Sequence, residues 1–187
     1  GTNVLHVGLP TNFKAAVFAN PAHTDMLRRL EADIAAVTID GKDVPVKLRV
    51  YDSLFVPMAK WSMLLTGNYR CVEADGVRPI RDAVHGDIDV SKQMYGWVDA
   101  LARELGADPV DQVSFEKYAN AANSLLKPSS AARAIDSGID RIERVDRLVQ
   151  IIGRGLGLQN QQLDEIVAIV DARLATNTNF KKVVNVG

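Results

Sequence analysis

The chain has 187 residues and a formal net charge of −1, and 47% of its residues are hydrophobic. This length suits one domain, or one domain with a fragment of another, and the composition is sufficient for a hydrophobic core. The balanced charge provides no global field that would attract nucleic acid or an anionic membrane surface. No apolar stretch approaches the roughly 20 residues that span a bilayer, and no signal peptide is visible. We therefore expect neither a nucleic-acid nor a membrane partner.

Cysteine usage favours a reducing compartment. Cys71 is the only cysteine, so an intramolecular disulfide is impossible and the cytoplasm is the expected location. A lone cysteine of this kind is most often a small buried apolar residue. The sequence starts at Gly1 instead of Met, and we expect that it was cut from a longer chain.

The first 51 residues predict a small α/β segment. Residues 4–9 and 15–18 are short apolar stretches bounded by Gly, Pro and Asn, which is typical of strands. A helix capped by Thr24-Asp25 follows them. Residues 35–39 and 44–50 flank an Asp-Gly pair and are predicted to form strand, turn and strand. The segment is too thin to close a sheet by itself.

Helical periodicity dominates from residue 52 onward and predicts a mainly helical domain over residues 52–187. Ser91 is an expected N-cap, and residues 176–187 are expected to be loose. The predicted helices are 53–67, a short helix ending near Gly86, 91–105, 111–126, 129–138, 139–152 and 161–174.

The segment 139–152 has the clearest helical pattern. Asp140 with Arg144, and Glu143 with Arg147, are opposite charges four residues apart. Each such pair stabilises a helix by about 0.2–0.5 kcal/mol.

Several kinds of site are excluded by missing motifs. No G-x-G-x-x-G follows a predicted strand, so this chain encodes no dinucleotide fold. The glycine-rich run 153–157 follows a helix instead of opening one, and we interpret it as a helix stop. His6, His23 and His85 lack metal-ligand spacing. Neither a G-x-S-x-G nor a P-loop is present.

Lys60 is the most informative charged residue, because it interrupts the almost wholly apolar stretch 56–65. Such a lysine either extends along apolar surface to reach water or is partly desolvated in a cleft. Desolvation lowers the pKa of a lysine and suits it to proton transfer. Composition alone favours the first interpretation.

The stretch from Asp52 to Asn68 resembles the first helix of the C-terminal domain of the ketopantoate reductase (2-dehydropantoate 2-reductase) family. That family has an Asp eight residues before a catalytic Lys, and Asn residues four and eight after it. Asp52, Lys60 and Asn68 match three of these positions. Leu64 replaces the first Asn, which removes one expected hydrogen bond to the substrate.

A second block, from residues 128–130 to the glycine-rich run, resembles the family's Ser-Ser … Glu-x-Asp … Gly stretch. In the family the second Ser binds the substrate carboxylate and the Glu hydrogen-bonds the substrate hydroxyl. Ser130 matches that Ser. Counting from either end of the block places the Glu at Arg141 or at Ile142, beside Glu143.

The resemblance implies a divergent member of the family, whose helical domain is of the 6-phosphogluconate-dehydrogenase C-terminal type. Residues 1–51 then correspond to the end of a cofactor-binding domain. The implied activity is NADPH-dependent reduction of a small 2-oxo acid. Lys60 would act as general acid and Glu143 as a second catalytic residue, while Asn68 and Ser130 would bind substrate. NADP would bind to a missing N-terminal Rossmann domain and not to this chain, and a homodimer is possible in this arrangement.

Two alternatives remain open. In the first, the chain is a non-catalytic helical interaction or dimerisation module, with Trp61, Tyr95 and Trp97 as interface anchors. Leu64 and the misaligned Glu favour this alternative. In the second, the chain keeps the reductase architecture but its substrate is another hydroxy acid, such as a phosphorylated one. That substrate would need a cluster of cationic residues, which the sequence does not reveal.

Overall fold

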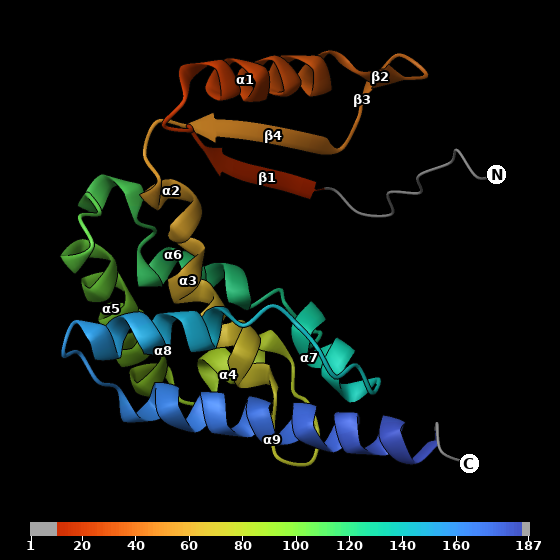
Figure 1. Ribbon diagram of the computed structural model, residues 1–187, viewed down its shortest axis with the longest axis vertical. Helices are drawn as coiled ribbons and strands as arrows, with labels where there is room; N and C mark the ends of the chain where they lie inside the picture. The colour runs from red at the N-terminus through yellow and green to blue at the C-terminus, as the bar shows by residue number, and fades with distance from the viewer. Residues whose placement is uncertain (1–10, 185–187) are drawn as a thin grey trace. The chain divides into compact units, whose positions relative to one another are not determined.

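The computed structural model describes residues 11–184 and is mainly helical with a small sheet (Figure 1). The predicted combination of a helical chain and a small α/β part is confirmed at this coarse level. The chain divides into two compact units, Gly1–Met58 and Ala59–Gly187. The sequence analysis placed this division at residue 51, before the short helix α2 (Phe55–Met58). We call these parts the α/β unit and the helical unit.

The α/β unit is built on a β-α-β crossover. Its elements are β1 (Thr11–Ala16), α1 (Pro21–Ala36), β2 (Thr38–Ile39), β3 (Lys42–Asp43), β4 (Val46–Tyr51) and α2. β1 and β4 pair in parallel, from Thr11 opposite Val46 to Ala16 opposite Tyr51. Parallel neighbours need a crossover connection, and α1 provides it.

Two strand predictions for this unit were wrong. Residues 35–36 end α1, and β4 pairs with β1 instead of with the strand before the turn. Only β2 and β3 form the hairpin, around Asp40 and Gly41, whose φ angles are 52° and 72°. Two consecutive positive φ angles are typical of a type I′ turn. The predicted strand at 4–9 lies outside the described residues.

Side chains of α1 satisfy the backbone of β4 at Val50. The Val50 amide donates to Glu31 Oε1 (3.2 Å), and Arg28 Nη1 donates to the Val50 carbonyl (3.5 Å). The helix begins one turn earlier than predicted, because Asn20 Oδ1 accepts from the Ala22 amide (3.0 Å). Thr24, the predicted cap, instead bonds the Phe18 backbone.

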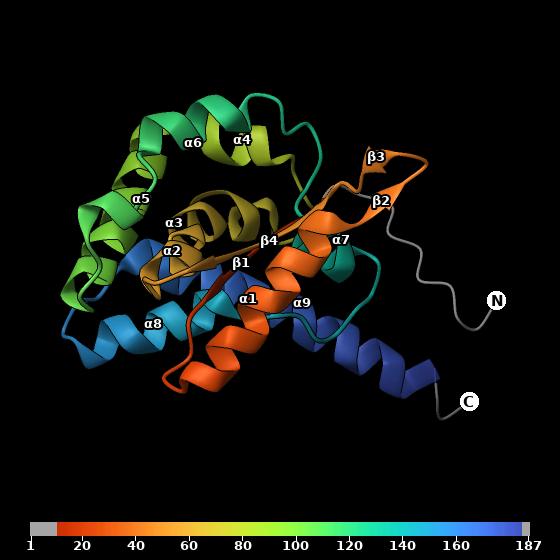
Figure 2. The ribbon, with the colours of Figure 1, turned by 90° about the horizontal axis from the view of Figure 1, so that it is seen from above.

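The helical unit is centred on a π-helical turn. Its elements are α3 (Lys60–Met63), the π-helix η1 (Leu64–Asn68), the 3₁₀ helix η2 (Tyr69–Cys71), α4 (Ile80–His85), α5 (Ile88–Glu104), the 3₁₀ helix η3 (Pro109–Asp111), α6 (Phe115–Ala122), α7 (Ser130–Asp136), α8 (Val145–Gly155) and α9 (Gln161–Val184). Within this unit η1 continues the chain from α3, which is labelled in Figure 2, and contacts α4, α5, α7 and α8. The core is formed by completely buried side chains of these elements and α9, among them Leu65, Met94, Leu101, Val149 and Val170.

The helix predicted at 139–152 begins only at Val145. Its first residues are non-helical, so the predicted ion pairs four residues apart do not arise from a helix. Arg144 instead pairs with Asp146 and Asp171 (2.8 and 2.6 Å), and Arg147 also pairs with Asp171. Tertiary contacts therefore override the local helical pattern in this segment.

The prediction of a loose C-terminal tail was wrong for residues 176–184, because α9 continues to Val184, and residues 185–187 lie outside the described part of the chain. Asn177 Nδ2 donates to the carbonyls of Ile135 and Ile139 (2.8 and 2.9 Å), which ties this part of α9 to the end of α7. Ser91 is not an N-cap but lies buried inside α5, where Asp87 caps the helix.

Gly67 makes room for a hydrogen bond between α6 and the end of α3, next to the π-helical turn. Tyr118 Oη donates to the Met63 carbonyl (3.1 Å). A Cβ atom at Gly67 would lie 2.1 Å from that hydroxyl oxygen. Such a distance cannot be tolerated without displacing the tyrosine.

We therefore expect Gly67→Ala to lower the free energy of unfolding by about 1–3 kcal/mol, as overpacking does. Adding Tyr118→Phe removes the clashing oxygen and should recover part of that loss, as urea denaturation would measure. Gly96→Ala is the matched control, because a Cβ there meets nothing within 4 Å and alanine favours a helix by about 1 kcal/mol. Equal stabilities of the Gly67 and Gly96 variants would contradict this account.

Candidate functional site

Three of the four predicted site residues line one pocket in the helical unit. Asn68 comes from η1, Ser130 from the first turn of α7, and Glu143 from the loop before α8. The pocket has a volume of about 280 Å³. Its remaining lining is Leu64, Tyr69, Ala131 and Ile142. We call it the Asn68–Glu143 pocket.

Ser129 connects two sides of this pocket. Its Oγ donates to the Asn68 carbonyl (2.8 Å) and accepts from the Ala132 amide (3.1 Å) as the N-cap of α7. The Ser129 side chain is buried, whereas Ser130 beside it is exposed. The buried serine therefore fixes α7 against η1, and the exposed serine remains available to a ligand.

The Tyr69 hydroxyl fixes the third side. Tyr69 Oη donates to the Glu143 carbonyl (2.6 Å) and accepts from the Val145 amide (2.9 Å). The side chain is only 4% exposed, and burial raises the pKa of Tyr69 from 10.0 to about 12. The hydroxyl thus stays protonated at neutral pH and holds the backbone on both sides of Arg144.

An ion-pair network around the buried Asp146 supports the same loop. Arg144 makes two hydrogen bonds to Asp146 (2.9 and 2.8 Å) and one to Asp171 of α9 (2.6 Å). Asp146 is completely buried. Although burial opposes it, the bonds to the two carboxylates raise the pKa of Arg144. A buried carboxylate without this partner would be strongly destabilising.

Lys60, the predicted general acid, lies outside the pocket lining. It is the first residue of α3 and its side chain is exposed. It precedes Leu64 by four residues, a spacing that places two side chains on one face of a helix. Leu64 gives the pocket an apolar wall where the family has an amide. Asp52, in the α/β unit, pairs with Arg28 (2.7 Å).

A second pocket adjoins the first and shares Asn68 and Ser130 with it. Its volume is about 460 Å³, and its walls are residues 124–129, Ile80 and Arg133. Two cationic side chains, Lys127 and Arg133, line it. Neither cation belongs to a recognisable sequence motif, so neither could be predicted from the sequence.

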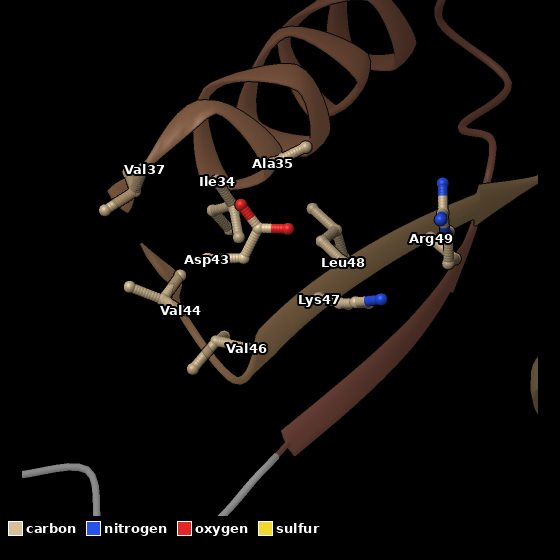
Figure 3. Close-up of a pocket in the computed structure, with 9 residues that line it drawn as sticks. All are labelled: Ile34, Ala35, Val37, Asp43, Val44, Val46, Lys47, Leu48 and Arg49. Atoms are coloured by element: carbon tan, nitrogen blue, oxygen red, sulfur yellow. The ribbon is translucent and has the colours of Figure 1, made fainter. Parts of the chain in front are cut away.

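The α/β unit contains two further pockets, remote in sequence from the predicted site. The pocket in Figure 3, of about 190 Å³, lies between the end of α1 and the start of β4. Ligands of parallel sheets bind at the carboxyl ends of strands, which here are Ala16 and Tyr51. The Figure 3 pocket is at the opposite end of β4. The other pocket is an apolar hollow along α1, lined by Phe18, Met26 and Leu30 among others.

Other chemistries find no support in the described part of the chain. Among residues 11–184, no group of three or more His, Cys, Asp and Glu side chains could hold a metal ion. Cys71 is buried as predicted, and burial raises the pKa of its thiol. Tyr95 lies in the core rather than at a surface. No helix in this range combines the length and hydropathy needed to cross a bilayer.

A scan against protein-family models found no match, and searches of curated proteins and of solved structures found no similar protein. Function is therefore inferred from the residues and geometry described above.

Replacing Tyr69 tests the support of the Glu143 loop. Tyr69→Phe leaves the Glu143 carbonyl and the Val145 amide without their shared partner, so unfolding should become easier by about 1–3 kcal/mol. Amide chemical shifts of residues 143–145 should move together in NMR spectra. Tyr51→Phe, a hydroxyl deletion in the α/β unit, should leave those shifts unchanged. Unaltered stability and shifts in Tyr69→Phe would show that the hydroxyl does not hold the loop.

Alkaline pH tests the same hydroxyl without mutation. The Tyr69 pKa is about 12 in the folded chain against 10.0 ordinarily, so folding favours the protonated form. The protonated hydroxyl therefore makes its full contribution to the free energy of unfolding below pH 10, and this contribution is lost as pH rises towards 12. Burial raises the pKa values of Tyr95 and Tyr118 as well. Urea midpoints should fall as the pH rises from about 10 towards 12, and less steeply in Tyr69→Phe. A flat profile would contradict this prediction.

Proposed function

We propose that the helical unit is the substrate-binding part of a 2-oxo-acid reductase resembling ketopantoate reductases. The observation that carries this proposal is the convergence of Asn68, Ser130 and Glu143 on one pocket. These residues come from two separate sequence blocks, because Ser130 and Glu143 follow Asn68 by 62 and 75 positions. Their common pocket is what a shared substrate would require.

Each lining residue has a role suited to its chemistry. The Ser130 hydroxyl and the Asn68 amide can donate hydrogen bonds to carboxylate and oxo oxygens. The Glu143 carboxylate can accept a bond from the hydroxyl group of the reduced product. Lys60 would protonate the developing alkoxide, reaching from the turn before Leu64. Leu64 and Ile142 would exclude water from the reacting carbon and thereby strengthen these polar interactions.

The cofactor would bind elsewhere in the complete protein. At the start of α1 the Asn20 side chain occupies the Ala22 amide, and Pro21 has no N–H to offer. The start of α1 therefore forms no pyrophosphate cradle. We infer that β1 and β4 belong to a larger Rossmann domain that carries NADP. Among the described residues this parallel sheet has two strands, which supports the inference because parallel sheets are normally larger and covered on both faces.

A non-catalytic role is the second candidate. It is favoured by the exposure of Lys60 and by the apolar Leu64. In that case the same pocket would bind a small acid, or the helical unit would bind a second copy of the chain, without turnover.

Substitution of Lys60 separates the two functions. In the protein that contains this chain together with its nucleotide-binding domain, Lys60→Ala should lower kcat for 2-oxo-acid reduction by about 10²–10⁴, the usual contribution of a positioned acid. Lys117→Ala, which removes an exposed lysine on α6, should leave kcat unchanged. Full activity in Lys60→Ala would exclude this lysine from catalysis. The chain alone should not oxidise NADPH.

A further inference from the structure

The pocket beside the Asn68–Glu143 pocket carries an uncompensated positive charge. Its lining contains two cations, Lys127 and Arg133, and none of its described lining residues is acidic. Within residues 11–184 neither cation forms an ion pair, whereas Arg144, Arg147, Arg154 and Arg173 are each paired with an aspartate. We call this pocket the Lys127–Arg133 pocket.

Backbone bonds hold its walls in place. The Ile80 amide donates to the Lys127 carbonyl (3.2 Å), and the Arg81 amide donates to the Leu125 carbonyl (3.0 Å). The loop before α7 is therefore tied to the start of α4. Arg133 follows Ser130 by three residues on α7, and this spacing brings two side chains to one helix face. The Lys127 backbone and the Ser130–Arg133 face thus have defined positions on the two sides of the pocket.

We infer that the Lys127–Arg133 pocket binds a second acidic group of the substrate, so that the substrate class is 2-oxo acids with two anionic ends. This inference rests on the proposed function for the reacting end of the molecule. The pocket shares Asn68 and Ser130 with the Asn68–Glu143 pocket, so one ligand can occupy both. A monocarboxylate bound at Ser130 would neutralise only one of the two cations. A dianion neutralises both, and Arg133 can bind a carboxylate through two parallel hydrogen bonds.

A phosphorylated substrate needs a cluster of cationic residues, which the sequence alone does not reveal. Lys127 and Arg133 now provide two cations at one pocket. A carboxylate and a phosphate would both satisfy them, since each offers several acceptor oxygens to charged donors. The shared requirement is a second anion on a small acid.

Two ligands of equal carbon number test the inference. 2-Oxopentanedioate carries a second carboxylate, and 2-oxopentanoate has a methyl group in its place. By NMR titration of the chain at low ionic strength, the dianion should bind at least about tenfold more tightly, equivalent to 1.4 kcal/mol. Arg133→Gln and Lys127→Gln should remove most of this preference, because each should weaken binding of the dianion more than binding of 2-oxopentanoate. Lys117→Gln, the matched control, should retain it.

The outcomes separate this inference from the proposed function. Equal affinities for the two oxo acids, with shifts around Asn68 and Glu143, would overturn the second-anion inference and leave the proposed function standing. Pentanedioate, which lacks the oxo group, and inorganic phosphate complete the test. If pentanedioate or phosphate binds in an Arg133-dependent manner and the oxo group adds nothing, the anion pocket stands and the proposed function fails. If none of these ligands shifts the resonances of residues 124–133, the inference is wrong.

Discussion

One buried hydroxyl group determines whether the candidate site exists. Tyr69 Oη holds the Glu143 carbonyl and the Val145 amide, and thereby keeps residues before α8 out of the helix that their sequence favours. Asn68, which precedes Tyr69 in the chain, forms one wall of the pocket. The bonds of the Tyr69 hydroxyl position a second wall, the loop that carries Glu143. Ser129 positions the third wall, the start of α7, by donating a hydrogen bond to the Asn68 carbonyl. The pocket is therefore a consequence of how η1 packs against its neighbours.

Most helices could be predicted because their signals are local. α7 lies within the predicted segment 129–138 and ends before Gly138, whose φ of 90° only glycine adopts readily. The predictions failed where distant contacts decide the backbone. The start of α8 depends on a tyrosine 76 residues earlier, and α9 continues through polar residues because Asn177 bonds the end of α7. Neither the hydrophobic periodicity of the sequence nor its helix-capping residues predict either contact.

The site was predictable to a similar degree. Motif spacing selected Asn68, Ser130 and Glu143, and they line a common pocket. Spacing also selected Lys60, which lies on the surface at the start of α3. It missed the residues that hold the pocket together, Tyr69 and Ser129, since a hydrogen-bonding side chain gives no sign of its partner in the sequence. It also missed Lys127 and Arg133, which lie within three residues of Ser130 but belong to no recognisable motif.

The central claim is that a small oxo acid binds between η1, α7 and the loop before α8. Intermolecular NOEs between 2-oxopentanoate and the methyl groups of the chain measure this most directly. The account predicts NOEs to Leu64, Ala131 and Ile142, which line three sides of the pocket. NOEs confined to Met26 and Leu30 on α1, or none at a saturating concentration of ligand, would contradict it.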